Sequence, residues 1–213
     1  MNNINTKDYW DNRFKTDWEE KSGRSQTSDF AKAQIPYFDI SPEFDGSILD
    51  FGCGLGDAIP IYKEYYPKAK LYGVDISSVG IEKCKGVYGC LADFTAGTEK
   101  EMQDVDIVIA SNVFEHLTDD KKVAKRILQK TEKLYIVVPY KENPLMDEHI
   151  NSYDEFYFSE LNVLWFKIFF AKGWTESGFR LFKLGVRNLI KILTGKKIQP
   201  RSRQIMFCLA RDA

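Results

Sequence analysis

The sequence has few of the residues that build covalent or metal-bound frameworks. Its 213 residues include four cysteines, Cys53, Cys84, Cys90 and Cys208, and no two of them form a CxxC pair. This spacing argues against a disulfide scaffold or a zinc site, and it favours the reducing environment of the cytoplasm. The two histidines and the carboxylates are not spaced as metal ligands either, so the sequence predicts no metal site.

Long hydrophobic runs and an excess of one charge are also missing. No stretch approaches the roughly 18 uninterrupted apolar residues of a membrane-spanning helix. The opening residues MNNINTKDYW lack the apolar segment of a secretory signal. The net charge of −1 gives the chain as a whole no basic excess, so we expect no nucleic-acid partner. With 44% hydrophobic residues, the chain can bury one good core as a single domain over residues 1–213.

Strand-like runs alternate with segments of helical length between residues 47 and 140. The five strand-like runs are 47–51, 69–75, 87–92, 105–111 and 133–139. The helical segments between them are 55–66, 77–86, 97–103 and 118–131. Alternating strands and helices predict a parallel sheet covered by helices on both faces, which is a doubly wound α/β fold. The strand-like runs hardly alternate in polarity, as expected of strands buried on both sides.

The two ends of the chain have a different pattern. Helices are expected at 8–14 and 29–38, with a polar connection over 16–29 for which a lid is the alternative. Beyond residue 140, the aromatic-rich run 157–170 is read as a buried helix against the sheet. A strand is expected at 178–186, a short amphipathic helix at 187–197, and the last strand at 203–210.

A basic segment near the end is hidden by the balanced total charge. Residues 179–203 contain eight basic residues and no acidic one. The other 22 basic residues face 31 acidic ones, so the rest of the chain carries a charge of −9. Three readings of the basic segment remain open: a solvated helix face, a site for an anionic substrate, or peripheral contact with an anionic membrane at its inner surface.

The run ILDFGCGLGD at residues 48–57 is the most informative stretch. A buried strand breaks into Gly52, Gly54 and Gly56, which lets the backbone approach a ligand at the carboxyl end of that strand. The spacing is one residue shorter than the dinucleotide fingerprint. Asp57 places a negative charge where a pyrophosphate would bind, whereas Asp75 after the next strand can accept hydrogen bonds from ribose hydroxyls. A ribose with a cationic group, as in S-adenosylmethionine, meets these requirements.

Four motifs in this order resemble those of the class I S-adenosylmethionine-dependent methyltransferases, in particular the type 11/12 small-molecule branch. They are ILDFGCGLGD, YGVDIS, LADF and DIVIASNVFEHL, and they cover about residues 46–140. The resemblance implies a Rossmann-like sheet of seven mostly parallel strands and S-adenosylmethionine as the cofactor. The cofactor-binding residues that it implies are Asp50, Gly52, Cys53, Gly54, Asp75, Ile76, Asp93, Phe94, Asn112 and Val113.

The resemblance also divides the chain by role. It implies an N-terminal helical lid over 1–46, a cofactor-binding core over 47–140, a substrate-side insertion with the basic segment over 141–203, and the last strand over 204–213. In this reading the run 157–170 forms a wall or lid of the substrate pocket.

The acceptor and its activation are less constrained. His149 follows the fifth strand and His116 follows the fourth, and both are candidate bases, with His149 ranked first. The alternative for both histidines is that they only brace neighbouring loops. Glu115 is expected to brace these loops and to take no part in the chemistry. The sequence lacks the motifs typical of DNA-base methylation. We therefore expect methyl transfer to oxygen or nitrogen of a small metabolite or a glycan or nucleotide-sugar precursor. A non-catalytic adenosyl-ligand binding module is the alternative, and a nicotinamide-dependent oxidoreductase is a weaker one.

Overall fold

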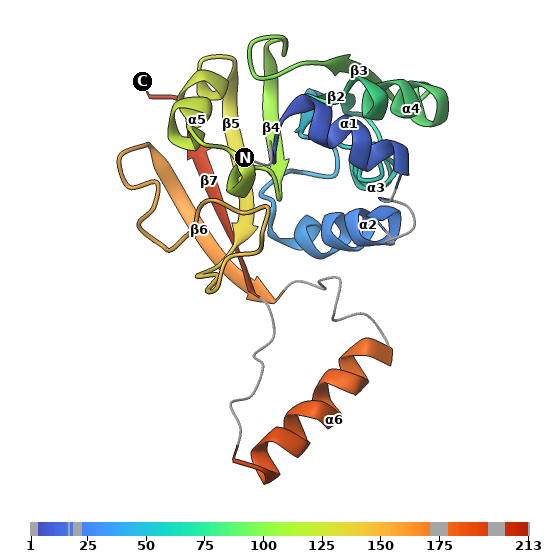
Figure 1. Ribbon diagram of the computed structural model, residues 1–213. Helices are drawn as coiled ribbons and strands as arrows, with labels where there is room; N and C mark the ends of the chain where they lie inside the picture. The colour runs from blue at the N-terminus through green and yellow to red at the C-terminus, as the bar shows by residue number, and fades with distance from the viewer. Residues whose placement is uncertain (1–3, 17, 19–22, 171–178, 196–202, 213) are drawn as a thin grey trace.

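The computed structural model describes residues 4–16, 18, 23–170, 179–195 and 203–212 (Figure 1). The helices are α1 (Lys7–Thr16), α2 (Gly23–Gln34), α3 (Ile59–Tyr65), α4 (Ser78–Tyr88), α5 (Asp120–Leu128) and α6 (Phe179–Leu193), with short 3-10 helices η1 (Ile35–Tyr37) and η2 (Phe114–His116). The strands are β1 (Ser47–Phe51), β2 (Lys70–Asp75), β3 (Ala92–Ala96), β4 (Val105–Ser111), β5 (Thr131–Pro139), β6 (Val163–Phe170) and β7 (Arg203–Ala210).

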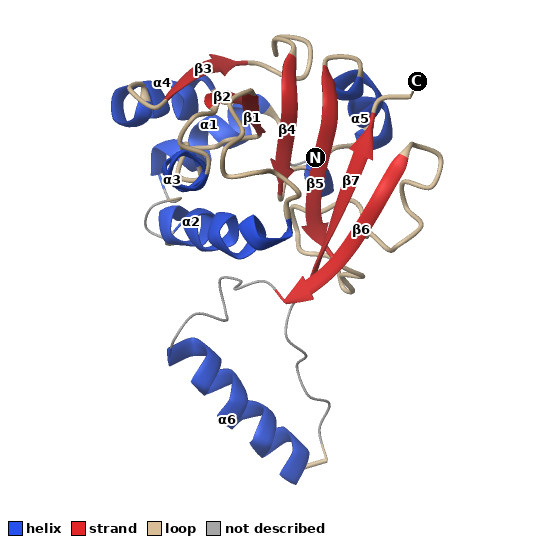
Figure 2. Ribbon diagram, turned by 180° about the vertical axis from the view of Figure 1, so that it is seen from behind, coloured by secondary structure: helices blue, strands red, loops and turns tan. Residues whose placement is uncertain are grey.

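All seven strands form one sheet in the order β3-β2-β1-β4-β5-β7-β6 (Figure 2). The strands from β1 to β5 pair in parallel, and β7 runs antiparallel between β5 and β6. This confirms the predicted doubly wound, mostly parallel seven-stranded sheet. Because the strand order reverses between β1 and β4, the carboxyl ends of these two strands meet at a switch point, which is where open α/β sheets bind ligands.

Two hydrophobic cores lie on opposite faces of the sheet. Successive strand residues alternate between them: Ile48 and Ile109 face the core covered by α3 and α4, while Leu49 and Val108 face the core covered by α5. Side chains on a strand point to alternate faces, and here both faces are buried. That is why the strands read as continuous apolar runs in the sequence.

Most of the core strands begin and end close to their predicted limits. Predictions at 47–51, 105–111 and 203–210 coincide with β1, β4 and β7, and the other two confirmed runs differ from β2 and β5 by one or two residues. Helix α3 begins only at Ile59, because the preceding residues form the glycine turn.

Two predictions in the middle of the chain were wrong. Residues 87–92 do not form a strand: α4 continues to Tyr88, whose hydroxyl bonds the buried Asp57, and β3 begins at Ala92. Residues 97–103 are turns and not a helix. Both the backbone N–H and the hydroxyl of Thr98 bond the Glu101 carboxylate, which closes a single turn that is not continued.

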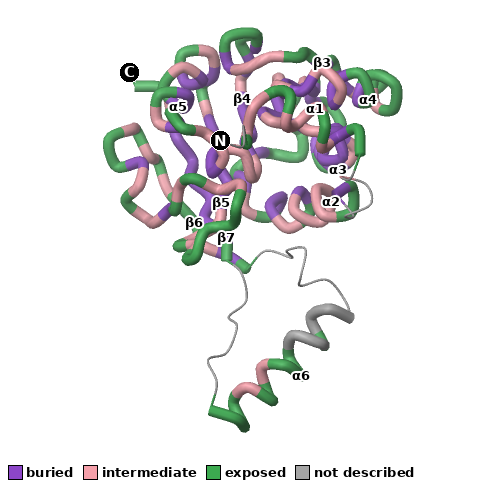
Figure 3. Tube along the Cα trace, in the orientation of Figure 1, coloured by how far each residue is buried: buried purple, intermediate pink, exposed green. Residues whose placement is uncertain are grey.

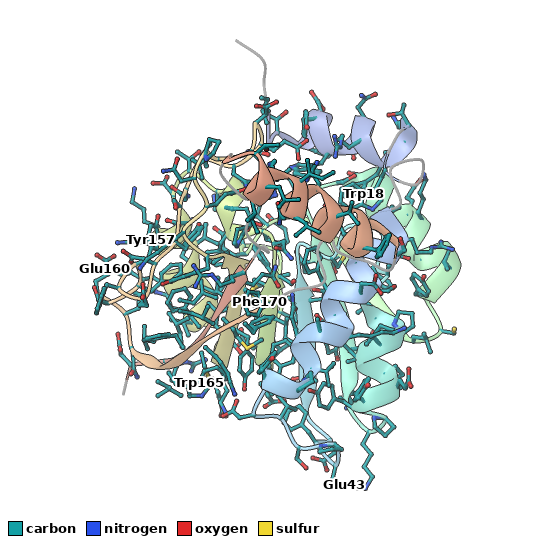
Figure 4. The ribbon with its side chains drawn as sticks, turned by 90° about the horizontal axis from the view of Figure 1, so that it is seen from below. Trp18, Glu43, Tyr157, Glu160, Trp165 and Phe170 are labelled. Carbon is teal, nitrogen blue, oxygen red and sulfur yellow. The ribbon has the colours of Figure 1, made fainter. Side chains whose placement is uncertain are left out.

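The ends also differ from the prediction. The run 157–170 is not a buried helix, because its second half is the edge strand β6, on which Figure 4 labels Trp165 and Phe170. Its role as a wall or lid of the substrate pocket remains a prediction. The predicted strand at 178–186 falls almost wholly within α6. The amphipathic helix predicted at 187–197 is confirmed up to Leu193, and Lys196 and Lys197 lie outside the described residues. Helix α2 begins within the connection predicted at 16–29, of which residues 17 and 19–22 lie outside the described residues.

Helix α6 stands apart from the sheet and its covering helices (Figures 1 and 3). Several of its apolar side chains are exposed, among them Leu189, Ile190 and Leu193. Within the described part of the chain, no helix is long and apolar enough to cross a membrane.

Candidate functional site

A cavity of about 720 Å³ opens at the carboxyl ends of β1, β2 and β4. Its walls come from the glycine turn after β1, the ends of β2 and β4, helices α1 and α2, and the loop 140–153 that follows β5. This volume lies within the range of about 300–1,000 Å³ that is usual for small-molecule sites. The sheet topology therefore places a ligand-sized cavity at the switch point.

The glycine turn presents bare backbone to this cavity. The N–H groups of Gly52 and Cys53 both donate to the carbonyl of Val74, at 2.7 and 3.1 Å, so the turn is fixed against β2. Gly52 has φ of +75°, and a Cβ at this position would lie 2.3 Å from Cγ2 of Val113. Gly54 has φ of +55°, and a Cβ there would meet Phe14 of α1 at 3.3 Å. Side chains at either position would fill the cradle.

Two buried carboxylates lie beside the turn. Asp75 accepts hydrogen bonds from the backbone N–H groups of Gly54 and Ser77, each at 2.8 Å. Burial raises the pKa of Asp75 to about 6, although these two hydrogen bonds oppose the rise. Burial, with repulsion from Asp75, raises the pKa of Asp50 to about 7. The hydroxyl of Tyr62, which also lines the cavity, is buried without a hydrogen-bond partner. This end of the cavity thus favours a ligand that brings positive charge and hydrogen-bond donors.

Eight of the ten predicted cofactor-binding residues line the cavity. These are Asp50, Gly52, Cys53, Gly54, Asp75, Ile76, Asn112 and Val113. The structure places Asp93 and Phe94 elsewhere: Asp93 is exposed in the middle of β3, and Phe94 is buried in the core next to Gly73. Because β3 starts later than predicted, its carboxyl end brings Gly97, Thr98 and Glu99 to the cavity in their place.

Asp57 does not face the ligand space, contrary to the prediction from the sequence. Asp57 is 2% exposed and does not line the cavity. Its carboxylate accepts a hydrogen bond from the hydroxyl of Tyr88 at 2.8 Å and pairs with Arg24 at 3.2 Å. The Asp57 carboxylate therefore forms contacts behind the glycine turn and does not face the cavity.

Helix α1 covers one side of the cavity. Phe14 is buried against the glycine turn, and Trp10 lies between Phe14 and His116, with ring centroids 5.8 and 5.2 Å away. Glu148 of the loop 140–153 pairs with Arg13 at 3.1 Å and accepts a hydrogen bond from Tyr9. These contacts join α1 to the loop on the far side of the cavity. The N-terminal lid remains a prediction, and this placement is compatible with it.

The two histidines lie together in the wall of the cavity, on η2 and on the loop 140–153. Their ring centroids are 5.0 Å apart. Nδ1 of His116 lies 3.1 Å from the carbonyl oxygen of Glu148, and burial lowers the pKa of His116 to about 4. Nδ1 of His149 lies 2.5 Å from the carboxylate of Glu142. Burial lowers the pKa of His149, but this hydrogen bond and the charges of Glu115 and Glu142 outweigh it and raise the pKa.

Backbone contacts explain why these distant residues meet. The N–H of Ile150 donates to the carbonyl of Glu115 at 2.8 Å, and the side chain of Asn151 donates to the carbonyl of Leu117 at 2.8 Å. The loop 140–153 is thereby fixed along η2. Glu115 itself is 1% exposed, and burial raises its pKa to about 7.

The sequence reasoning missed several residues that line the cavity. From α1 and α2 come Trp10, Arg13, Phe14, Gln26, Thr27 and Phe30, and from β7 come Arg203 and Gln204. Gln204 is 3% exposed and donates to the Asn112 side chain at 2.7 Å. A polar residue at the start of the otherwise apolar run 204–210 was a signal that could have identified it.

Comparison with known proteins agrees with this geometry. Residues 49–134 match the family described as methyltransferase domain, type 12. A malonyl-[acyl-carrier protein] O-methyltransferase from Anoxybacillus flavithermus is 35% identical over 94 residues. The match covers 41% of this chain and 36% of that protein, so it spans about a third of the relative's length.

Solved structures share the fold at low identity. The complex between the Haloferax volcanii Trm112 methyltransferase activator and a methyltransferase contains a chain with a TM-score of 0.67 and 13% identity, covering 96% of this chain and 98% of that one. The plantazolicin methyltransferase BpumL in complex with SAH has a TM-score of 0.60 and 16% identity, covering 96% and 91%.

The family match covers the glycine turn and the strands β2, β3 and β4, whose carboxyl ends line one side of the cavity. The resemblance noted from the four motifs is thereby confirmed. Residues 49–134 are thus similar to the methyltransferase domain family, in agreement with the resemblance to the type 11/12 branch.

Proposed function

We propose that this protein transfers a methyl group from S-adenosylmethionine to an oxygen or nitrogen of a small acceptor. The observation that carries the proposal is the cradle between Gly52 and Gly54, which a Cβ would fill, beside two buried carboxylates. When bound, S-adenosylmethionine supplies a methyl group on a sulfonium, whose displacement leaves a neutral thioether. The protein then has to bind, align and exclude water, and alignment alone can contribute several kcal/mol.

Each polar group of the cradle has a role in binding. The carboxylate of Asp75, held by the N–H groups of Gly54 and Ser77, would accept hydrogen bonds from the ribose hydroxyls. Asp50 would face the positively charged methionine end, because a cation there offsets the cost of its buried charge. At the end of β3, Thr98 and Glu99 replace Asp93 and Phe94 as the residues proposed near the adenine.

The helices would complete the enclosure. Trp10 and Phe14 of α1 place apolar rings over the cavity, and Phe30 and Ala31 of α2 line it. We propose that α1 acts as the lid over the bound cofactor, since its contacts with Glu148 join the two sides of the cavity. Excluding water in this way strengthens electrostatic interactions inside the site.

The acceptor is proposed to be small, with an oxygen nucleophile favoured. The cavity must hold the cofactor as well, which leaves limited room for a second molecule. The relative from Anoxybacillus flavithermus is named for methylation of oxygen. A metabolite or a glycan or nucleotide-sugar precursor with a hydroxyl or carboxyl group fits this description. His149, paired with Glu142, is the proposed group that would accept the proton of a hydroxyl acceptor, with His116 beside it, whereas a carboxylate acceptor is already ionised and needs no base.

The test is a turnover assay with a matched binding assay. The protein is incubated with S-adenosylmethionine and a panel of small carboxylic acids, alcohols, amines and nucleotide sugars, and S-adenosylhomocysteine and methylated products are measured by mass spectrometry. Turnover with an oxygen or nitrogen acceptor supports the proposal. Tight cofactor binding without turnover across the whole panel would favour a non-catalytic binding module. Calorimetric binding of a nicotinamide cofactor in preference to S-adenosylmethionine would reject both.

Helix α6 favours a second, peripheral interaction with an anionic membrane surface. Val186, Leu189, Ile190 and Leu193 are exposed and lie within about a third of the helix circumference. Arg187 and Lys191 lie on the opposite face, and the helix contains no acidic residue. A helix of this pattern lies in the membrane interface with its apolar face inserted and its basic face toward anionic headgroups. An anionic soluble substrate would need the basic residues but not the apolar stripe.

Vesicle binding tests this part of the proposal. The protein should co-sediment with vesicles containing phosphatidylglycerol and not with pure phosphatidylcholine, and added salt should weaken binding. The double variant Arg187→Glu/Lys191→Glu should lower vesicle affinity by about tenfold or more, at roughly 1 kcal/mol for each basic residue near the surface. Lys122→Glu/Lys125→Glu on α5 changes the net charge equally and should have little effect. Equal losses in both variants would contradict a role specific to α6.

A further inference from the structure

We propose that Glu115, His116 and His149 bind one divalent transition-metal ion, of the Zn²⁺ class, at the acceptor end of the cavity. Each of these residues offers one ligand atom, and the three atoms lie within 4.8 Å of one another. All three residues line the cavity. Metal binding itself is independent of the proposed methyl transfer, whereas the role of the metal described below rests on that function.

The distances suit a site that contracts slightly around an ion. Ligand atoms at about 2.1 Å from a tetrahedral Zn²⁺ lie roughly 3.4 Å apart. Side-chain movements of about 1 Å would therefore close the observed separation. Glu115 and His116 are consecutive residues of η2, and His149 is held beside them by the hydrogen bond from Ile150 N–H to the Glu115 carbonyl.

Both histidines are oriented as metal-binding histidines usually are. Nδ1 of His149 is bonded to the Glu142 carboxylate, and Nδ1 of His116 is bonded to the Glu148 carbonyl oxygen, so each Nδ1 carries the proton and donates it. The lone pair of a neutral imidazole then lies on Nε2. A carboxylate or carbonyl partner of this kind fixes the tautomer and ring orientation of a metal ligand. The structure thus supplies the outer contacts of a metal site as well as its ligands.

Glu115 provides the independent observation that points to a ligand. Its side chain is buried at 1% exposure, and its Oε2 atom has no hydrogen-bond partner. A buried carboxylate oxygen without a partner is costly, and such groups are normally paired or coordinate a metal. Two further carboxylates, Glu142 and Glu148, lie next to the histidines, while Arg13 pairs with Glu148. With both histidines neutral and the three carboxylates ionised, the local charge is negative and would be balanced by a divalent cation.

The ligand types select the kind of metal. Two imidazoles and one carboxylate are typical of Zn²⁺ and of Fe²⁺ or Co²⁺ sites, whereas Mg²⁺ and Ca²⁺ prefer oxygen ligands. Three protein ligands leave at least one coordination position open toward the cavity. An acceptor hydroxyl or carboxyl oxygen bound there would be held in place, and a hydroxyl would release its proton to solvent water more readily. On this proposal His149 binds the metal, and this role replaces the role of base given to it under the proposed function.

A Co²⁺ titration of the full chain, after chelator treatment and dialysis, tests the site. Binding should give visible d–d absorption that saturates at one ion per chain and is displaced by Zn²⁺. Glu115→Gln, His116→Ala and His149→Ala should each weaken Co²⁺ binding by at least about 100-fold. Glu142→Gln should weaken it by about 10- to 100-fold, the usual effect of losing an orienting partner. Cys90→Ser, which removes the exposed free thiol, should leave the titration unchanged.

The outcomes separate the site from a structural role and from the proposed function. Glu115→Gln should keep wild-type affinity for S-adenosylmethionine, which shows that the variant is folded. Co²⁺ absorption that is absent, or that persists in Glu115→Gln and His149→Ala, would overturn the metal site. Metal binding without any methyl transfer would leave the site standing and reject the proposed function. Methyl transfer unaffected by chelator and by Glu115→Gln would overturn the role of the metal in activating the acceptor.

Discussion

Gly54 has no side chain, which permits its left-handed backbone conformation and leaves space for a ligand in the cavity. Its N–H donates to Asp75, and its φ of +55° lies in the left-handed region. We predict that Gly54→Ala lowers the affinity for S-adenosylmethionine by at least about tenfold. A non-glycine residue in this region costs roughly 1–2 kcal/mol, and the added Cβ would press on Phe14. Calorimetric titration and thermal unfolding measure both effects.

Gly86 provides the matched control for this substitution. It lies inside α4, and a Cβ there would meet nothing within 4 Å. Gly86→Ala should therefore keep wild-type cofactor affinity and raise the stability by up to about 1 kcal/mol, because alanine favours a helix interior. A similar loss of affinity in both variants would contradict the proposed role of the glycine turn.

The Asp75 carboxylate holds two backbone N–H groups beside the glycine turn. Asp75→Asn should weaken binding of S-adenosylmethionine at least about tenfold and destabilise the protein by about 1–3 kcal/mol. The amide has one accepting oxygen, so one of the two backbone N–H groups now bonded by the carboxylate would lose its partner. Asp93→Asn, an exposed change on the neighbouring strand, should alter neither quantity. Equal loss in Asp93→Asn would restore that residue as a cofactor contact.

The residues whose place at the cavity could be predicted are those whose position depends on local sequence. Gly52 and Gly54 lie just after β1 and Asp75 ends β2, and the pattern located both strands within one residue. Asp93 was misplaced because the start of β3 was five residues off, which moved it from the carboxyl end to the middle of the strand. The grouping of His116 with His149 depends on the path of the loop 140–153, which no local pattern specifies.

At the scale of elements, α1 and α4 are joined by one carboxylate. Asp11 of α1 accepts hydrogen bonds from the Ser77 hydroxyl at 2.5 Å and from the Val79 N–H at 3.1 Å, at the start of α4. Burial opposes ionisation, but the hydrogen bonds from Lys7, Ser77 and Val79 hold the pKa of Asp11 at about 2. The contact thus works as a helix cap supplied by another helix.

We predict that Asp11→Ala lowers the free energy of unfolding by about 1 kcal/mol, which is typical of a lost cap. Because α1 also carries Trp10 and Phe14 over the cavity, affinity for S-adenosylmethionine should fall several-fold. Denaturant titration and calorimetry measure these changes. Asp8→Ala, at an exposed position of the same helix, is the control and should change the affinity little. An unchanged affinity in Asp11→Ala would argue against α1 as a lid.

Elements on the edges of the fold were the hardest to predict, for a physical reason. In β6, outward-facing Leu164, Phe166 and Phe170 are exposed and apolar, so the strand lacks the alternation of polarity that identifies a half-buried strand. In α4, Val87 and Tyr88 favour strands, but packing of the Tyr88 ring and its bond to Asp57 keep them helical. In α4, tertiary contacts outweighed local preference.

On the scale of the whole molecule, charge is unevenly distributed. The acidic body encloses buried carboxylates around the cavity, whereas α6, which contains no acidic residue, stands apart from it (Figure 1). No described residue of α6 lines the cavity. The cofactor site and the surface contact should therefore be separable, with vesicles changing cofactor affinity little.

The buried carboxylates also make the stability of the whole fold depend on pH. The pKa is raised to about 7 for Asp50 and to about 6 for Asp75, whereas exposed aspartates ionise near pH 4. Between about pH 4 and pH 7, Asp50 and Asp75 keep protons in the folded protein that the unfolded chain has already lost. The free energy of unfolding therefore falls as pH rises through this interval. Each unit of pKa shift corresponds to about 1.4 kcal/mol.

We predict that Asp50→Asn flattens this decline, and denaturant titrations at pH 5.5 and 8 will measure it. In the wild type the unliganded protein should be less stable at pH 8, because Asp50 must then be charged next to Asp75 and the buried hydroxyl of Tyr62. S-adenosylmethionine brings positive charge to Asp50, so its affinity should rise by about tenfold or more over the same interval. Asp45→Asn, an exposed change, should reproduce the wild-type profile. If Asp50→Asn also shows the wild-type rise in affinity with pH, then Asp50 does not face the cationic end of the cofactor.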